Sequence, residues 1–111
     1  QEVRPGSFFI APPNAVATVR GGRFSLRPPR TASERRNPID RLFHTLAEAY
    51  GSAAVGIVLS GSGSDGALGL GSIGAAGGMT MAQAPETAAF REMPSSVAAA
   101  ADHVLPPADL A

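Results

Sequence analysis

The 111-residue sequence contains no cysteine, which excludes disulfide bonds, thiolate metal sites and a cysteine nucleophile. Aromatic residues make up only 5% of the chain and tryptophan is absent, so a hydrophobic core must be built mainly from alanine, valine, isoleucine and leucine. Lysine is absent too: arginines balance the acidic residues, and a net charge of zero does not indicate a nucleic acid or an anionic membrane as partner. There is no signal peptide and no transmembrane run. We therefore expect a soluble, cytoplasmic domain without membrane insertion.

The length allows one domain at most, and it is small for a doubly wound sheet. The chain starts with Gln1, and the segment up to Gly6 is typical of the interior of a protein. We therefore expect residues 1–111 to be the C-terminal part of a single, larger domain.

The most informative stretch runs from Ala53 to Gly66. Residues 53–59 form an unbroken apolar run, which is typical of a strand buried on both faces in a parallel sheet. A loop of glycines and serines follows, and it carries one acid, Asp65. Because open α/β sheets place their chemistry at the carboxyl ends of their strands, Asp65 is the first candidate for a functional residue.

The rest of the chain alternates strands and helices. Gly21-Gly22 predicts the tight turn of a β-hairpin over residues 16–27. Asn37-Pro38 predicts the start of a helix that Gly51 ends. The fold class is therefore α/β, a doubly wound, mostly parallel sheet that the antiparallel hairpin makes mixed. The other expected elements are strands at 7–10, 79–82 and 103–105, helices after Asp65 and at 95–101, and a polar loop at 28–36.

Two sets of polar residues outside the loop are weaker candidates. Asp40, His44 and Glu48 recur at intervals of four along the expected helix, a spacing that could bind a metal, but such a helix face is usually only solvated. The arginines of residues 28–36 could contact an acidic partner, but polar connecting loops are usually solvated as well. We expect neither set to form a site.

Two interpretations of the loop would give this chain chemistry of its own. Residues 61–66 match the dinucleotide-binding pattern Gly-x-Gly-x-x-Gly, with Glu86 placed to contact a ribose, but Asp65 would put negative charge where the pyrophosphate binds. Ser64 lies in a setting similar to the nucleophile elbow Gly-x-Ser-x-Gly. A serine nucleophile needs a base, and neither His44 nor His103 is expected in a neighbouring loop.

In the third interpretation, Asp65 is the acid of a Ser-His-Asp triad whose other members lie elsewhere. Such an acid accepts the imidazole N–H, fixes the tautomer and stabilises the imidazolium. A simpler alternative is that Asp65 only caps the helix that follows it. The two roles are compatible, because a carboxylate has two oxygens.

Residues 59–70 resemble the acid-bearing loop of the CheB-type chemotaxis protein-glutamate methylesterases, in the form that is fused to a CheR-type methyltransferase. Further segments agree in order and spacing: Phe9-Ile10-Ala11-Pro12-Pro13-Asn14, Pro38-Ile39-Asp40-Arg41-Leu42-Phe43, Ala76-Gly77-Gly78, Ala82-Gln83 and Met93-Pro94. The resemblance implies that residues 1–111 are the C-terminal part of a methylesterase catalytic domain, and it places the triad aspartate at Asp65.

The resemblance also implies a function. Members of the family hydrolyse glutamyl methyl esters on chemoreceptors during adaptation, without a metal or cofactor. Gly61, Ser62 and Gly63 would border the oxyanion or substrate side of the site. The serine nucleophile and the histidine base would lie upstream, so the isolated segment is expected to be inactive and to self-associate. The alternative is a non-catalytic module, either a degenerate methylesterase segment or a dinucleotide-binding fragment.

Overall fold

The structure, a computed structural model, describes residues 2–7, 9–61, 63–99 and 101–110. Among these residues, no helix is both long and apolar enough to cross a membrane. The strands are β1 (Val16–Arg20), β2 (Arg23–Arg27), β3 (Val55–Val58), β4 (Met79–Gln83) and β5 (His103–Leu105). The helices are α1 (Ala32–Arg36), α2 (Pro38–Tyr50), α3 (Ala67–Ala75) and α4 (Glu92–Val97), with short 3-10 turns η1 (Gly51–Ala53), η2 (Pro85–Thr87) and η3 (Pro107–Asp109).

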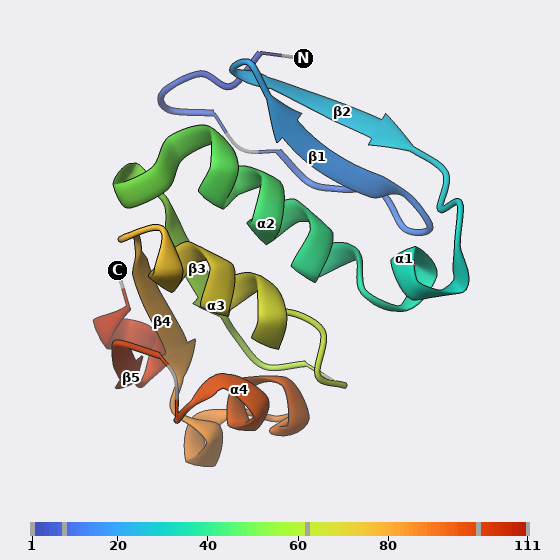
Figure 1. Ribbon diagram of the computed structural model, residues 1–111. Helices are drawn as coiled ribbons and strands as arrows, with labels where there is room; N and C mark the ends of the chain where they lie inside the picture. Colours follow the sequence, from blue (N-terminus) through green and yellow to red (C-terminus); the bar gives the residue numbers. More distant parts are fainter. Residues whose placement is uncertain (1, 8, 62, 100, 111) are drawn as a thin grey trace.

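The predicted hairpin is confirmed. Strands β1 and β2 pair antiparallel, and Gly21 and Gly22 make the turn with φ angles of 58° and 72°, which favour glycine. The hairpin forms a two-stranded sheet of its own, so the expectation that it makes the parallel sheet mixed is wrong. The physical reason is α2, which lies between the hairpin and α3 (Figure 1) and contacts both, so that the hairpin packs on a helix instead of pairing with parallel strands.

Helix α2 is the central element of the packing. It begins at Pro38, and its last residue, Tyr50, is followed by Gly51 at the C-cap, as the sequence predicted. One side contacts β1, whose Val16 and Val19 are buried. The other side packs against α3, where Ala47 of α2 forms a core cluster with Ala54 and Ile73, and Phe43, Leu46 and Tyr50 lie around it.

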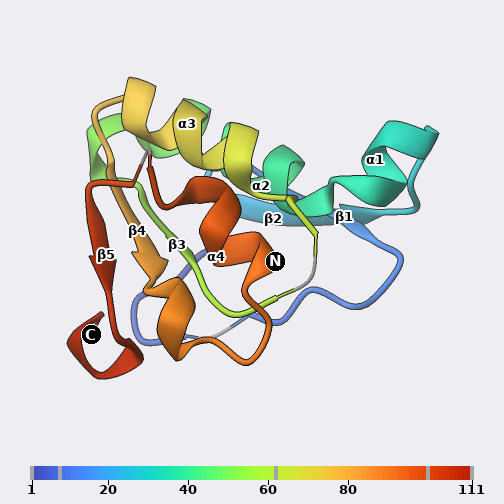
Figure 2. The same ribbon diagram turned by 90° about the horizontal axis from the view of Figure 1, so that it is seen from below.

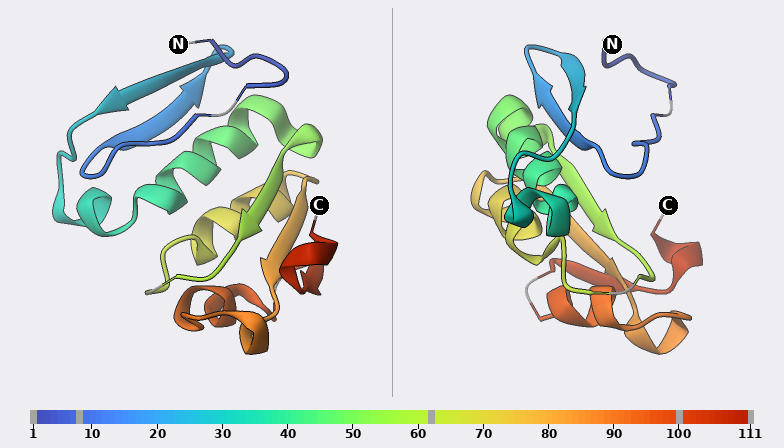
Figure 3. Two further views of the ribbon diagram at one scale, coloured as in Figure 1. Left: turned by 180° about the vertical axis from the view of Figure 1, so that it is seen from behind. Right: turned by 90° about the vertical axis from the view of Figure 1, so that its right-hand side faces the viewer.

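The second sheet contains three parallel strands in the order β3-β4-β5. This confirms the α/β class and the strands predicted at 79–82 and 103–105. Helices α2, α3 and α4 lie on one side of these strands (Figures 2 and 3). Val58, Leu70, Ala82 and Val97 form the core cluster between the strands and the helices.

The other face of the parallel sheet is apolar and open to solvent within the described chain. Val55, Ile57 and Met79 are 50%, 39% and 43% exposed, respectively. The first strand of the sheet, β3, is also an edge strand. The expectation that residues 53–59 are buried on both faces at the centre of a sheet is therefore not met in this chain, and Ala53 belongs to η1.

Two smaller expectations also differ from the structure. Ser7, Phe9 and Ile10 are not in a strand, and Phe8 lies outside the described residues. The Phe9 ring instead packs on Phe24 of the hairpin, with the ring centroids 4.6 Å apart. The last helix begins at Glu92, before the predicted start at residue 95, and ends at Val97.

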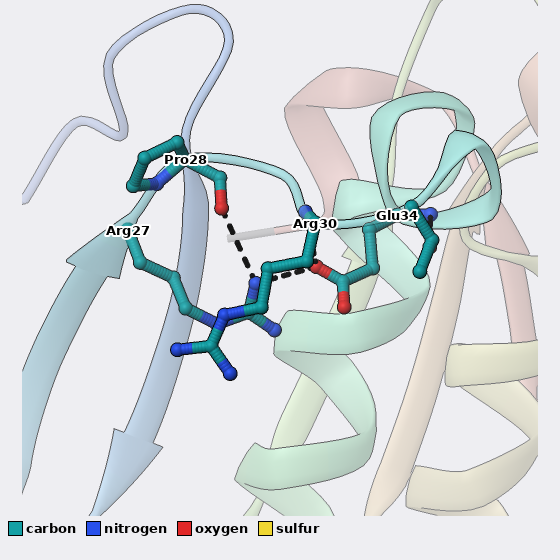
Figure 4. A network of polar contacts seen from close by, with 5 residues as sticks. Arg27, Pro28, Arg30 and Glu34 are labelled. Carbon is teal, nitrogen blue, oxygen red and sulfur yellow. Dashed lines mark hydrogen bonds and ion pairs between the residues drawn. The ribbon is translucent and has the colours of Figure 1, made fainter.

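The polar loop predicted at residues 28–36 contains a short helix, α1. Thr31 Oγ1 accepts a hydrogen bond from the Glu34 amide at 3.1 Å, which caps the helix. The Glu34 carboxylate accepts from Arg27 Nη1 at 2.5 Å and from the Arg30 amide at 3.2 Å (Figure 4). Glu34 therefore attaches α1 to the end of the hairpin, and Arg30 takes part through its backbone.

The first prediction concerns the contact between α2 and the hairpin. Thr45 is 5% exposed, and its Oγ1 accepts from the Val19 amide at 3.1 Å and donates to the Leu42 carbonyl at 2.9 Å. Thr45→Val should lower the free energy of unfolding in urea by about 1–3 kcal/mol, because the buried Val19 amide loses its acceptor. Thr45→Ser keeps the hydroxyl and should lose less. Equal losses in the two variants would show that the hydrogen bond is unimportant.

The second prediction concerns the pKa of Glu34. The hydrogen bonds from Arg27 and from the Arg30 amide lower the pKa of this carboxyl from 4.5 to about 2. Because the folded pKa is depressed, the stabilisation is complete above pH 4.5 and is lost as the pH falls towards about 2. An NMR titration of the carboxyl carbon should show this low midpoint, and Arg27→Gln should raise it. Arg23→Gln, at the start of the same strand, is the matched control and should leave it unchanged. A wild-type midpoint near 4.5 would contradict the assignment.

Candidate active-site loop

Asp65 lies in the loop that connects the carboxyl end of β3 to the start of α3. The strand ends at Val58, the loop covers residues 59–66, and α3 begins at Ala67. This is the strand, loop and helix unit that the sequence predicted. Asp65 itself is half-buried. Its carboxylate therefore lies at the edge of the sheet where parallel α/β folds carry their sites.

The Asp65 carboxylate binds the N-terminus of α2. Its Oδ2 accepts from the Ile39 amide at 2.8 Å, and its Oδ1 accepts from the Asp40 amide at 2.9 Å. Asn37 occupies the N-cap position of α2 but makes no side-chain hydrogen bond to the helix. Asp65 thus caps α2, a helix that precedes it in the chain, and the simpler alternative that it caps the following helix does not describe the contacts observed.

The following helix, α3, is capped by Asp40. Asp40 Oδ1 accepts from the Gly66 amide at 3.0 Å and from the Gly69 amide at 2.7 Å. The starts of the two helices are therefore capped reciprocally: Asp65, before α3, binds the start of α2, and Asp40, in α2, binds the start of α3. From the sequence, Asp40 was considered for a metal site with His44 and Glu48 and as part of a segment that resembles the family, and this contact was missed.

The local environment raises the pKa of the Asp65 carboxyl above its ordinary value. Burial is the main cause, and the neighbouring Asp40 carboxylate acts in the same direction. The amide groups of Ile39, Asp40 and Gly66 act against this and lower the pKa. A partly buried acid that is held by several hydrogen bonds and faces a second acid is typical of functional sites.

The loop is also held by residues outside α2. The Ser60 amide donates to Gln83 Oε1 at 2.9 Å, and Gln83, at the end of β4, is 6% exposed. Gly61 donates its amide to the Phe90 carbonyl and accepts from the Met93 amide, both at 3.0 Å. Sequence reasoning did not assign Gln83 a role. Its position at the carboxyl end of the neighbouring parallel strand is a signal that could have identified it.

Of the three residues expected on the oxyanion side, Gly61 and Gly63 are described and Ser62 is not. The Gly61 amide is bound by Phe90, and the Gly63 amide donates to the Glu92 carboxylate. In this arrangement, neither amide group is free to bind an oxyanion.

The same contacts disfavour dinucleotide binding by the glycine pattern. A pyrophosphate would need the amide groups at the start of α3, and these already bind the Asp40 carboxylate. Glu92, bound at Gly63, adds a second acid beside the pattern.

The histidines lie apart from the loop serines. His44 contacts Glu48 at 2.9 Å and Ser72 Oγ at 3.4 Å, and His103 lies on β5. Ser64 therefore has no histidine base among the contacts of the described chain. Asp40 binds α3 and does not join His44 and Glu48, and no group of three metal-binding side chains occurs in the part of the chain that the structure describes.

Comparisons with known proteins show which protein family the chain belongs to. The family model described as CheB methylesterase matches residues 1–111, and the chain belongs to this family. The crystal structure of the Thermotoga maritima CheB methylesterase catalytic domain superimposes with a TM-score of 0.81 at 32% sequence identity, covering 96% of this chain and 59% of that one.

Two relatives show how much of a protein the chain represents. A protein-glutamate methylesterase/protein-glutamine glutaminase of Myxococcus xanthus is 40% identical over 114 residues, which is 97% of this chain and 33% of that protein. An uncharacterized 104.1 kDa protein of Rhodobacter capsulatus is 42% identical over 101 residues, which is 88% of this chain and 10% of that protein. The chain therefore spans a third or less of the length of these two relatives.

Proposed function

We propose that this chain is the C-terminal, acid-bearing part of a protein-glutamate methylesterase domain, and that Asp65 is the triad aspartate. The observation that carries the proposal is the position of Asp65: a half-buried carboxylate at the carboxyl end of a parallel strand, bound to two amide groups of α2 at 2.8 and 2.9 Å. Membership of the CheB methylesterase family supports the reaction class.

The geometry is suited to orienting a histidine. An ionised carboxylate has about four lone-pair positions. The two hydrogen bonds to α2 use one position on each oxygen, and the Gly66 amide also acts on the carboxyl group, so the carboxylate can still accept a further hydrogen bond. An imidazole N–H bound there would be held in one tautomer, and Asp65 would stabilise the imidazolium that forms when the histidine takes the proton of the serine nucleophile.

The proposed reaction is acyl transfer in two steps. The serine oxygen attacks the glutamyl ester carbonyl, and the histidine returns the proton to the leaving methoxide, so that methanol departs and an acyl-enzyme remains. Water then attacks the acyl-enzyme with the same histidine as base, which releases the glutamate side chain and restores the serine. In this scheme Asp65 neither attacks nor becomes protonated, and the chemistry needs no metal or cofactor.

We propose methylated chemoreceptors as the substrate and the cytoplasm as the location. The name of the Myxococcus xanthus relative pairs this methylesterase activity with a protein-glutamine glutaminase activity. An amide and an ester of the same side chain can share one acyl-enzyme, with ammonia leaving in place of methanol, so the proposed site could serve both. We also propose a CheR-type methyltransferase in the same parent protein, on the basis of the sequence resemblance.

The serine and the histidine would come from the rest of the catalytic domain. This chain covers 59% of the Thermotoga maritima domain, which leaves a substantial part of such a domain to supply them. The edge strand β3 and the exposed Val55, Ile57 and Met79 offer the surface on which that part would pack. Without it, unpaired edge groups and an open apolar face favour self-association.

The third prediction tests Asp65 in the complete parent protein. Asp65→Asn should lower the kcat for methanol release from methylated receptor peptide by about 10⁴-fold, because the amide cannot fix and stabilise the histidine as a carboxylate does. Asp109→Asn, an exposed acid in η3, is the matched control and should keep wild-type turnover. An Asp65→Asn enzyme with most of its turnover would limit Asp65 to capping α2.

The fourth prediction concerns the isolated chain. Residues 1–111 alone should release no methanol above background and should scatter light as they associate. Both properties should reverse when the remaining part of the catalytic domain is supplied, in the same chain or separately. Turnover by the isolated chain that survives His44→Ala and His103→Ala would contradict the proposed division of the triad.

A further inference from the structure

We propose that Asp40 is a positioning residue for Asp65, and that it holds the loop 59–66 where the Asp65 carboxylate can reach the histidine. This inference rests on the proposed function. The observation behind it is that Asp40 contacts Asp65 and the residue that follows Asp65: its amide donates to Asp65 Oδ1 at 2.9 Å, and its Oδ1 accepts from the Gly66 amide at 3.0 Å.

These contacts fix Asp65 at two points. The first holds the carboxylate and therefore limits rotation of the side chain. The second holds the backbone directly after Asp65 and therefore limits movement of its Cα atom. Both contacts start from Asp40 in the first turn of α2, and the Ile39 amide of the same turn binds the other carboxylate oxygen. The position and the orientation of Asp65 are therefore set by the first turn of a regular helix. A site placed on such an element is held more precisely than one on a free loop.

The third contact of Asp40 explains why α2 and α3 approach so closely. Asp40 Oδ1 also accepts from the Gly69 amide at 2.7 Å. A Cβ atom at position 69 would lie 2.7 Å from Phe43 Cβ and 2.9 Å from Asp40 Cα, so only glycine fits without a shift of one helix. Gly69 is therefore the position at which α3 lies closest against the first turns of α2.

One oxygen of Asp40 accepts both α3 amides, and this allows its geometry and its charge to be tested separately. Asn has an equivalent Oδ1 that can accept the same two hydrogen bonds, but it carries no charge. Asp40→Asn should therefore keep the loop in place. Asp40→Ala keeps the backbone amide that binds Asp65 Oδ1 but removes the acceptor of the Gly66 and Gly69 amides, so the backbone after Asp65 should be released. Glu48→Gln, on the exposed face of the same helix, is the matched control for removing an acid from α2.

The experiment measures methanol release from methylated receptor peptide by the complete parent protein and its variants. Asp40→Ala should lower kcat by about 10²-fold, the size expected for a misplacement of about 1 Å in a catalytic group. KM should change by less than about threefold, because substrate binding is not the contact removed. Asp40→Asn should recover kcat to within about tenfold of the wild type, and Glu48→Gln should match the wild type. Circular dichroism establishes that each variant is folded.

The pH profile gives a readout that a purely structural role would not change. The charged side chain that acts on the Asp65 carboxyl is Asp40 of α2, and its negative charge raises the pKa of Asp65. The same charge would raise the pKa of a histidine bound to Asp65. The acid limb of kcat/KM should therefore move to lower pH in Asp40→Asn and stay in place in Glu48→Gln.

The outcomes separate this inference from the proposed function. Loss of turnover in Asp65→Asn together with wild-type kcat in Asp40→Ala would overturn the positioning role and leave the proposed function intact. Asp40→Asn as inactive as Asp40→Ala would also overturn it, because the acceptor geometry would then not suffice. If Asp40→Ala does not fold, the acid limb in Asp40→Asn decides, and an unshifted limb overturns the inference. Full turnover in Asp65→Asn would instead refute the proposed function.

Discussion

The reciprocal capping of α2 by Asp65 and of α3 by Asp40 is the interaction on which the site depends. The first turn of a helix leaves backbone amides without partners inside the helix, and it carries a partial positive charge. In this chain the amides of α2 are bound by Asp65 and those of α3 by Asp40. Thus α2 supplies the acceptor for the start of α3, and the loop that leads into α3 supplies the acceptor for the start of α2. The loop conformation requires α2 to be in place, and the start of α2 requires the loop.

This arrangement has two opposing effects on the pKa of the Asp65 carboxyl. Burial and the Asp40 carboxylate favour the protonated form and raise its pKa, whereas the amide groups around it favour the ionised form. A carboxyl whose folded pKa is raised costs stability as the pH rises through the interval between its unfolded and folded values. Burial of the Asp65 carboxyl beside Asp40 therefore costs some stability once this group is ionised. Such a balance is common where a charge serves chemistry rather than folding.

The sequence predicted the elements whose signals are local. The hairpin turn at Gly21-Gly22, the helix from Pro38 to Tyr50 and the placement of Asp65 after a parallel strand all depend on residues that lie next to one another. Helix α1 also had a local signal, the Thr31 cap with Glu34 three residues later, which is the pattern of a capping box. The contacts of Asp40 and Gln83 could not be read in this way, because a side chain there binds an amide more than twenty residues away. Whether a face of the sheet is covered depends on which other segments pack on it, and the hydrophobic pattern of a strand does not contain that information.

The behaviour of Asn37 shows why the helix cap and the proposed catalytic acid are the same residue. Asparagine is among the best N-cap residues, and an Asn37 side chain bonded to its own helix would satisfy an amide of α2 locally. Asp65 would then lose part of its anchorage and could rotate. In the structure the Asn37 side chain makes no such hydrogen bond. The backbone amide of Asn37 donates to the Ser33 carbonyl at 2.9 Å, so this residue also ends α1. The amides of Ile39 and Asp40 are left to an acceptor from outside the helix, and Asp65 fills that place. The orientation of Asp65 therefore follows from the hydrogen bonds that these two amides require. This requirement does not depend on whether a substrate or a histidine is bound.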